Sequence, residues 1–430
     1  MKLAIKNATL ISMDETRKQV EEQIDIYVED GQIKNIGKNL KELDENIKII
    51  DAKKKVVMPG LINTHAHIPM SIFRETLDGY NLQEWLNDKI WPMEDKLQEQ
   101  DIYYASYLSF IEMIKTGCTT INDMYFMTDE IIKAMEETGI RLQTTRTLQD
   151  IDGVEAGEKR LQELQRLIDK YKNKNSKLTF NVGIHGLYTS SLQYVQKCIE
   201  FAKKNNLHIH MHFCENQKEV EDIKNNYNKE PMQVLLQEFK NVKTILAHCV
   251  KLENEDIENL KSMDISVAHC PVSNLKLGCG IAKISEMIED GINVSIGTDG
   301  QGSGSNLDLF EAMKYTALLQ KGVTENPKLL PAYEVLKMAT INGAKTLGLE
   351  DKVGSIEIGK RADIIIIDLD TVLTKPVNNI VSEIVYNIKG NNVCTTIVDG
   401  NILMEDRKLT KNIENDVALK CDNIIKRISN

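Results

Sequence analysis

The chain has 430 residues, 42% hydrophobic and 27% charged, so it can bury a large core and is not a disordered chain. Its 53 Lys and Arg against 64 Asp and Glu give a net charge of −11, the wrong sign for an electrostatic nucleic-acid binder. A small-molecule partner is favoured instead, and the length fits one barrel of about 250 residues plus a smaller domain.

Cysteine usage and hydropathy indicate the compartment. The eight cysteines contain no C-x-x-C pair, which removes the usual thiolate zinc module and redox dithiol, and we expect reduced core thiols. Lys6 and Asn7 interrupt the first apolar stretch, so no secretory segment forms there. The longest aliphatic run, 364–367, is far too short for a membrane span. These features predict a cytoplasmic protein without a membrane partner.

Both ends of the chain are rich in short β-like runs. In residues 1–58 such runs alternate with turn chemistry, at 3–11, 24–28, 32–36 and 47–50. Residues 355–430 repeat the style at 362–368 and 393–403, where Asp399-Gly400 is a hairpin signal between two apolar runs. Two β-rich ends therefore flank a long middle region with a different hydrophobic pattern.

In that middle, short apolar runs alternate with helical stretches such as 100–116, 191–204 and 306–320, which is typical of a parallel α/β architecture. The strand candidates are 56–64, 119–124, 141–145, 179–184, 209–213, 244–247, 266–268 and 293–297. Eight parallel strands separated by helices predict a (β/α)8 barrel, whose catalytic groups gather at the carboxyl ends of the strands.

Most of the histidines stand where a predicted strand ends. His65 and His67 are two apart at the end of the first barrel strand, so both rings point to one side and can share a metal. His212 ends the fifth strand and Asp299 follows the eighth, and the four together predict a His3Asp metal site with room for water. Taken singly, a histidine is more often a packed core residue and an Asp before Gly a turn residue. His210 is expected deeper in the barrel, in a packing or supporting role.

Three more residues are candidates for the chemistry. Glu215 follows His212 by three residues, an offset that requires a turn and places the carboxylate in the loop beside the metal, where it suits proton transfer. The alternative is an ordinary carboxylate at a helix N-terminus. His248, ending the sixth strand, can hold the attacking water or polarise the reacting group. His185 follows the fourth strand, where two-metal barrels often carry a bridging lysine that this segment lacks, so we expect one ion.

The segment Pro59-Gly60-Leu61-Ile62-Asn63-Thr64-His65-Ala66-His67 closely resembles the metal-binding signature of the amidohydrolase superfamily. His212 with Glu215, then His248, then Thr298-Asp299 resembles its one-metal deaminase and chlorohydrolase branch. The resemblance covers nearly the whole chain. It implies a metal-dependent (β/α)8 barrel at 59–354 and a small composite β-sandwich domain from 1–58 and 355–430.

For the metal centre, the resemblance implies ligation by His65, His67, His212 and Asp299, with Glu215 as the proton shuttle. One divalent ion per chain is expected, zinc first, although iron or manganese could occupy the same set.

The segment NLQEWLNDKIWPMEDKL, which ends at Leu97, resembles the deaminases that act on 5'-methylthioadenosine and S-adenosylhomocysteine. The substrate contacts that this implies are Glu94 to the ribose hydroxyls, His185 to the adenine ring edge, Trp85 as an apolar wall and Arg146 to the homocysteine carboxylate. Arg160 falls only loosely on the position of a second arginine. Glu94 could instead lie on a solvated helix face, and Arg146 could belong to a structural ion pair.

These residues predict hydrolytic deamination of a 6-aminopurine nucleoside, namely 5'-methylthioadenosine, S-adenosylhomocysteine or adenosine, to the inosine analogue and ammonia. Activated water attacks C6 and Glu215 carries a proton to the ring nitrogen, with Asp299 and His248 managing the nucleophile. The alternatives are a guanine or cytosine deaminase or a chlorohydrolase of the same branch, and a non-catalytic scaffold. Glu94 and Arg146 discriminate, because a free base has neither ribose nor carboxylate. A homo-oligomer is compatible with the sequence, which leaves the oligomeric state open.

Overall fold

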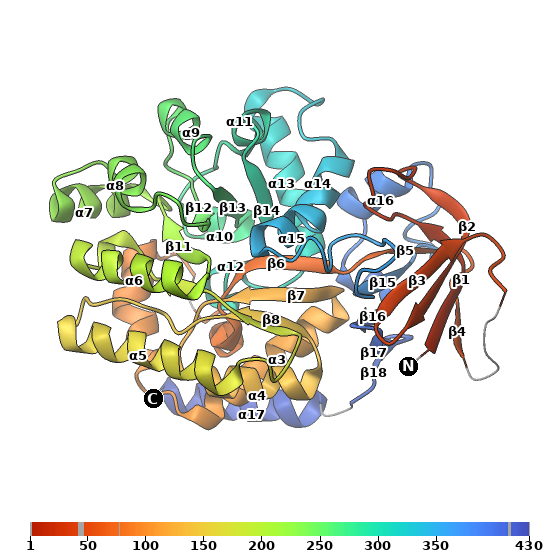
Figure 1. Cartoon of the computed structure of the whole chain (residues 1–430), viewed down its shortest axis with the longest axis horizontal. Coiled ribbons are helices and arrows are strands. Elements are labelled where there is room, and N and C mark those ends of the chain that lie inside the picture. The colour runs from red at the N-terminus through yellow and green to blue at the C-terminus, as the bar shows by residue number, and fades with distance from the viewer. Residues whose placement is uncertain (1, 42–46, 77, 412–413, 430) are drawn as a thin grey trace.

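The computed structural model describes residues 2–41, 47–76, 78–411 and 414–429. At its centre, parallel strands are surrounded by helices, and a separate sheet lies to one side (Figure 1). The predicted TIM-like α/β barrel is confirmed.

The barrel strands form two hydrogen-bonded arcs, β6-β7-β8-β9 and β10-β11-β12-β13-β14, with every pair parallel. Their bounds are β6 Leu61–Ala66, β7 Cys118–Asp123, β8 Arg141–Thr144, β9 Leu178–Phe180, β10 Val182–Ile184, β11 Ile209–Phe213, β12 Thr244–His248, β13 Ile265–His269 and β14 Asn293–Ile296. The predicted strand 179–184 is divided at Asn181, whose side chain donates to Asn122 Oδ1 at 2.6 Å. At the other junction Asp299 N donates to His65 O at 3.0 Å, which holds the ends of β14 and β6 together.

The predicted strand 56–64 is wrong as a single element. The chain breaks at Gly60 into β5 (Lys55–Pro59), which joins the side sheet, and β6, which opens the barrel. A Cβ at Gly60 would lie 2.2 Å from the side chain of Thr119, so only glycine fits this crossing. An apolar run carries no mark of a change of sheet, and for this reason the pattern predicted one strand.

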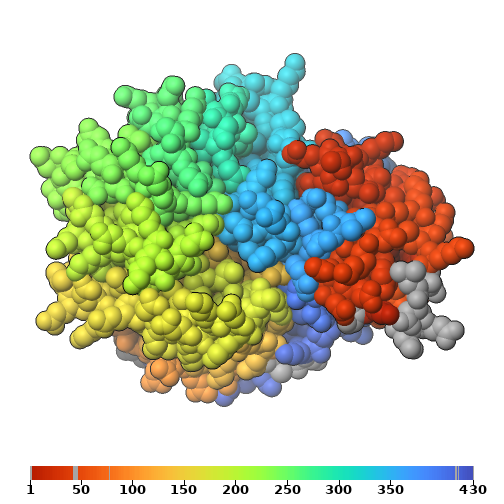
Figure 2. All heavy atoms as spheres, in the orientation of Figure 1, coloured from red at the N-terminus to blue at the C-terminus, as the bar shows by residue number. Residues whose placement is uncertain are grey.

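The side sheet interleaves strands from both chain ends, and its order is β18-β17-β16-β15-β5-β1-β2-β3 with β4 paired to β1. The remaining bounds are β1 Lys2–Leu10, β2 Glu21–Glu29, β3 Gln32–Gly37, β4 Lys48–Asp51, β15 Ile364–Asp368, β16 Val393–Val398, β17 Asn401–Glu405 and β18 Lys408–Leu409. The predicted hairpin at Asp399-Gly400 is present, with φ of +54° and +74°, as a two-residue turn between antiparallel strands requires. Figure 2 shows the N-terminal strands in red adjoining the light-blue region near residue 350.

Helices cover the outside of the barrel, and the predicted stretches 100–116, 191–204 and 306–320 form α3, α6 and α13. The longer helices are α3 Glu99–Lys115, α4 Thr128–Thr138, α5 Val154–Tyr171, α6 Leu192–Asn205, α7 Gln217–Tyr227, α8 Pro231–Glu238, α13 Leu309–Thr324 and α17 Glu414–Ile428. The shorter ones are α1 Leu82–Trp85, α2 Trp91–Glu94, α9 Asn254–Leu260, α10 Pro271–Lys276, α11 Ile284–Glu289, α12 Gln301–Gly304, α14 Ala332–Met338, α15 Ile341–Leu347 and α16 Ile380–Tyr386. A π-helical turn, Leu86–Ile90, joins α1 to α2.

The C-terminal end is not purely β-rich, because it also contains two helices, α16 between β15 and β16 and α17 after β18. Helix α17 lies along α3 at the lower edge of the barrel (Figure 1), held by the Arg427–Asp101 ion pair and by Lys115–Glu414 at 2.9 Å. Its buried residues recur at helical spacing: Val417, Cys421, Ile424 and Ile428. The same spacing is visible in the sequence, so this helix could have been predicted from it.

The chemical expectations for the core hold where they can be checked. All eight cysteines are free and buried. Over the described ranges, no helix combines the length and apolarity that a bilayer span requires. Arg141 on β8 donates to both oxygens of Asp363, at 2.8 and 3.0 Å, and this buried pair ties the barrel to the side sheet.

Candidate active site

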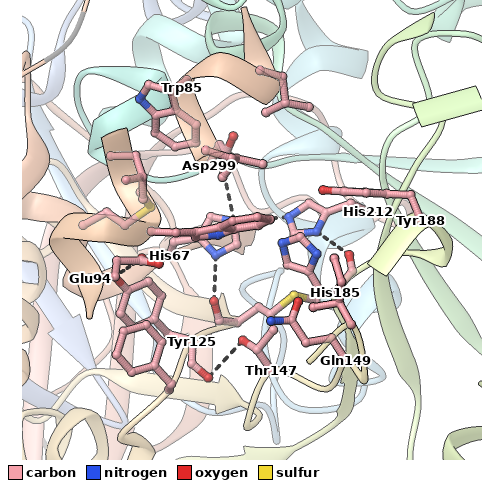
Figure 3. Close-up of a pocket in the computed structure, with 18 of the residues that line it drawn as sticks. His67, Trp85, Glu94, Tyr125, Thr147, Gln149, His185, Tyr188, His212 and Asp299 are labelled. Atoms are coloured by element: carbon pink, nitrogen blue, oxygen red, sulfur yellow. Dashed lines mark hydrogen bonds and ion pairs between the residues drawn. The ribbon is translucent and has the colours of Figure 1, made fainter. Parts of the chain in front are cut away.

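A cavity of about 540 Å³ opens at the carboxyl ends of the barrel strands. Its lining contains most residues that the sequence singles out: His67, Trp85, Glu94, Arg146, Arg160, His185, His212, Glu215, His248 and Asp299. Figure 3 shows the His67 and His212 rings converging with Asp299, while Glu94 and Tyr125 lie together to one side. The predicted metal and substrate residues therefore share one pocket, except for His65, which is fully buried and not part of the lining.

The four predicted metal ligands meet at the bottom of this pocket. His65 Nε2 lies 3.5 Å and His67 Nε2 3.2 Å from Asp299 Oδ1. One ligand atom from each of these residues lies within 4.8 Å of the others, and the same holds for His65, His212 and His248. Strand ends from opposite sides of the barrel thus bring the set together.

The orientation of two imidazoles calls for a cation between them. His67 Nδ1 donates to Met124 O at 2.7 Å and His212 Nδ1 donates to His185 O at 2.6 Å. The Nε2 atoms of the two rings face each other at 3.2 Å. When neither Nε2 carries a proton, the two rings point lone pairs at one another, and one positive charge between them, a proton or a metal ion, converts the contact into attraction.

The neutral state of His65 and His212 also favours metal binding. Burial lowers the pKa of His65 to about 4 and the pKa of His212 well below its usual range, so both rings are neutral donors near pH 7. His65 Nε2 is buried with no hydrogen-bond partner in the described chain. Burial opposes the charge on His67, but Asp299 outweighs it and raises the pKa of His67 to about 9, so a bound cation would compete with a proton there. The donor set fits a divalent metal.

Asp299 is aimed by its surroundings. Its Oδ2 accepts hydrogen bonds from Ser273 Oγ at 2.6 Å and Ser303 Oγ at 2.8 Å, which leaves Oδ1 facing the imidazoles. Burial would raise the pKa of this carboxyl, yet the adjacent His65 and His67 rings hold it well below its usual range. The backbone φ of Asp299 is +63°, in the left-handed region that non-glycine residues rarely adopt, as strained functional positions often are.

Glu215 is fixed on the pocket side of the cluster. Glu219 accepts the backbone N–H groups of Cys214 and Glu215, at 2.9 and 2.7 Å, which pins the turn after β11. Glu215 Oε2 lies 3.7 Å from His248 Nε2, and Cys279 Sγ contacts Oε1 at 3.7 Å. Burial raises the pKa of Glu215, as suits a carboxyl that must take and return a proton.

His248 is oriented from the neighbouring strand. Its Nδ1 donates to Asn274 Oδ1 at 2.8 Å, so Nε2 points at Glu215 and the metal cluster. The backbone φ of His248 is +74°, another left-handed position at the end of a barrel strand.

The predicted base and ribose contacts line the wall between cluster and rim. Glu94 is not on a solvated helix face: it is held by a hydrogen bond from the Tyr125 hydroxyl, and burial raises its pKa to about 7. Trp85 is 5% exposed and its indole N–H has no partner within the described ranges. Burial lowers the pKa of His185 to about 3, so the ring is neutral, and its Nδ1 contacts Thr189 Oγ1 at 3.0 Å.

Both arginines reach the pocket, and both hold carboxylates of the protein itself. Arg146 Nε donates to Glu163 at 2.8 Å and Nη1 donates to Thr147 O at 2.9 Å. Arg160 forms a two-pronged pair with Asp152 at 2.5 and 2.6 Å. The ion pair that the sequence left as an alternative for Arg146 is therefore present.

Two other histidines lie behind the site. His210 Nε2 shares a 2.8 Å hydrogen bond with His65 Nδ1, and Asn122 Nδ2 lies 3.2 Å from His210 Nδ1, which agrees with the expected supporting role. The His269 ring is 1% exposed and neither nitrogen has a partner in the described chain.

Sequence reasoning missed the partners that orient these groups, namely Tyr125, Glu219, Ser273, Asn274 and Ser303. Two signals were available. Ser273 follows His269, the last residue of β13, by four residues, and Ser303 follows Asp299 by four residues, so both lie at the catalytic edge.

The chain belongs to the amidohydrolase family, whose model matches residues 56–403, and members of this family bind a divalent metal. It is 40% identical over 433 residues to a 5-methylthioadenosine/S-adenosylhomocysteine deaminase of Caldanaerobacter subterraneus subsp. tengcongensis, covering 99% of each chain. It is 43% identical over 401 residues to a 5'-deoxyadenosine deaminase of Methanocaldococcus jannaschii, covering 93% of this chain and 95% of the relative. A zinc-bound adenosine deaminase structure from Xanthomonas campestris matches with a TM-score of 0.94 at 26% identity, covering 99% of this chain and 98% of the other.

Proposed function

We propose that this enzyme is a hydrolase of C–N bonds that deaminates adenosine analogues with a modified 5' position, releasing ammonia and the inosine analogue. One observation carries the proposal: the Nε2 atoms of His67 and His212 face each other in the cavity that Glu215 also lines. The names of the relatives, which are deaminases of 5'-methylthioadenosine, S-adenosylhomocysteine and 5'-deoxyadenosine, support the substrate class.

His65, His67, His212 and Asp299 would hold one divalent ion, for which zinc is our first choice. When bound, such an ion supplies the Lewis acidity that makes water a nucleophile at neutral pH. Ser273 and Ser303 donate to Asp299 Oδ2 and keep Oδ1 turned to the imidazoles, so the carboxylate is already oriented to bind the ion.

Glu215 moves the proton. Its raised pKa lets it take a proton from the attacking water and deliver it to the ring nitrogen next to C6. His248 Nε2, 3.7 Å from Glu215 Oε2, can accept a hydrogen bond from the attacking water and so orients the nucleophile. The C6–N bond then breaks, and the amino group leaves as ammonia with the proton of the new C6 hydroxyl, which Glu215 is placed to carry.

Glu94 would accept hydrogen bonds from the ribose hydroxyls, because a carboxylate can accept from two adjacent hydroxyls at once. Its hydrogen bond from Tyr125 supports this role, since it holds the carboxylate at the cavity wall. His185 would meet the purine edge and Trp85 would cover the base. Arg146 and Arg160 stand at the far end, toward the 5' substituent.

We also propose the domain division expected from the sequence. Residues 59–354 would be the catalytic barrel, and 1–58 with 355–430 a composite β-sandwich domain. The shared sheet of both chain ends, with its own apolar cluster that includes Ile5, Ile26 and Ile364, supports the composite domain.

An ammonia-release assay tests the function. The purified chain, loaded with zinc, is given 5'-methylthioadenosine, 5'-deoxyadenosine, S-adenosylhomocysteine, adenosine, adenine and guanine. We expect kcat/KM for the best nucleoside to exceed that of any free base at least tenfold, because a buried polar group left unpaired costs about 1 to 3 kcal/mol. A free base as the best substrate would support the nucleobase deaminase alternative instead.

A further inference from the structure

The outer end of the pocket is lined by charged residues from the loop 147–153 and the start of α5. Arg160 Nη1 and Nη2 donate to Asp152 Oδ1 and Oδ2, at 2.5 and 2.6 Å, and Nη1 also donates to Gln149 O at 2.8 Å. This two-pronged pair is the geometry by which arginine binds any carboxylate. The protein's own side chain therefore takes the place that a substrate carboxylate would need.

The two partners are held to different degrees. The Arg160 side chain is 16% exposed and anchored from the loop by Gln149 O, whereas the Asp152 side chain is 50% exposed on a two-residue turn. The cation is part of the pocket wall, and the anion can be displaced from it. Exposed ion pairs contribute little to stability, so a substrate carboxylate can displace Asp152 at a small cost in binding free energy.

The electrostatic balance around the pair does not favour an anionic ligand. Arg146, the other arginine of the rim, donates to Glu163 at 2.8 Å. Asp150 lies on the same loop and accepts from Ser191 N and Oγ at 2.7 and 2.6 Å. Among the described residues, the charges of Arg146 and Arg160 are thus matched by three nearby carboxylates, those of Asp150, Asp152 and Glu163, which leaves no net positive charge there for a substrate carboxylate.

We propose that Asp152 is a built-in competitor at the anion-binding position of the rim, and that it makes the enzyme prefer adenosine analogues with a short uncharged 5' group over those that end in a carboxylate. The proposal rests on the proposed deaminase function and names the specificity of the same site. A carboxylate-ended substrate must displace Asp152 from Arg160 before it binds, whereas a 5'-methyl or methylthio group leaves the pair intact.

The test is the ratio of kcat/KM for S-adenosylhomocysteine to kcat/KM for 5'-methylthioadenosine in the zinc-loaded full chain. We expect a ratio below one in the wild type, and a rise of about fivefold in Asp152→Asn and Asp152→Ala, carried mainly by KM for S-adenosylhomocysteine. Glu155→Gln is the matched control, because it removes a negative charge from the exposed first turn of α5, away from the pocket lining. Its ratio should stay within twofold of the wild type.

Three results would overturn the inference: a wild-type ratio above one, an unchanged ratio in both Asp152 variants, or a ratio that falls. A fall would mean that Asp152 binds the ammonium group of the substrate. An adenosine thioether that ends in a carboxylate without the amine separates these cases, because it should gain even more from Asp152→Asn. The failure of the underlying function is distinguishable, since the wild type would then deaminate no nucleoside at all. Melting temperatures of the variants check that each chain is folded.

Discussion

The two ends of the pocket are built in different ways. At the metal end each functional side chain comes from a strand end and is held by a buried partner, as Met124 O holds His67 and Asn274 holds His248. At the outer end, charges on a loop and a helix pair with one another and stay partly exposed, as Arg160 and Asp152 do. Preorganised groups suit an invariant reaction, and displaceable pairs suit a choice among substrates. Chemistry and specificity are therefore separable in this molecule.

The largest effect should follow from removing a metal ligand. Asp299→Ala takes away the carboxylate that faces His65 and His67. We expect loss of the bound ion and ammonia release below detection, for all substrates alike. Elemental analysis of the purified protein should give about one ion per chain in the wild type and none in the variant. Two tightly held ions in the wild type would contradict the single-metal site.

A milder change tests whether orientation at this end matters. Ser303→Ala keeps Asp299 but removes one of the two hydroxyls on its Oδ2. Loss of such a supporting contact typically costs about 10- to 100-fold in metal affinity or activity. Competition with a metal chelator measures the affinity, and an unchanged value would show that Ser273 alone orients the carboxylate.

A third prediction concerns the proposed proton carrier. Glu215→Gln preserves the shape of the side chain but cannot relay a proton, so we expect normal metal content with kcat lowered by about 10²- to 10⁴-fold. The loss should be the same for every nucleoside, because the group acts on the purine ring and not at the 5' end. Metal analysis beside steady-state kinetics decides it. A kcat close to that of the wild type would assign the proton transfer to another residue.

The sequence predicted the metal end far better than the rim, for a physical reason. The placement of His65, His67 and His212 follows from the alternation of side chains along strands and from the fact that parallel barrel strands end at one edge. The offset of Glu215 from His212 required a turn, and the turn is there. What aims these groups could not be seen, because Ser303 and Tyr125 meet their partners only through the tertiary fold.

At the rim the sequence identified Arg146 and Arg160 but not their partners. The direction of a loop side chain such as Asp152 cannot be predicted from a periodic sequence pattern, because its pairing depends on the path of the turn. The same limit applied to the fold. The break at Gly60 lies inside an apolar run, and only the close approach of Thr119 reveals the change from one sheet to the other.

A fourth prediction tests Glu94, which lies between the two ends. Burial raises the pKa of Glu94 to about 7, so the carboxyl is mainly protonated below that pH and ionised above it. The ionised form is the better acceptor for ribose hydroxyls, and KM for nucleosides should fall as the pH rises from 6 to 8. Glu94→Gln should flatten this dependence and lower kcat/KM for nucleosides about tenfold, within the range for hydrogen bonds to a charged group. A pH dependence of KM that persists in the variant would point to a different titrating group.

The smallest effect should be on stability, at the rim. Arg160–Asp152 and Arg141–Asp363 are both two-pronged pairs, but the carboxylate is 50% exposed in the first and 2% exposed in the second. We expect Asp152→Asn to change the free energy of unfolding by less than about 1 kcal/mol. Asp363→Asn, the buried control, should cost up to about 3 to 5 kcal/mol, because it removes the main carboxylate partner of the buried Arg141 and leaves it the longer contact with Asp399, at 3.6 Å. Denaturant unfolding of the two variants measures both values. If Asp152→Asn proved as costly as Asp363→Asn, the rim pair would be a structural element and could not yield to a substrate, so the contrast between the two ends of the pocket would fail.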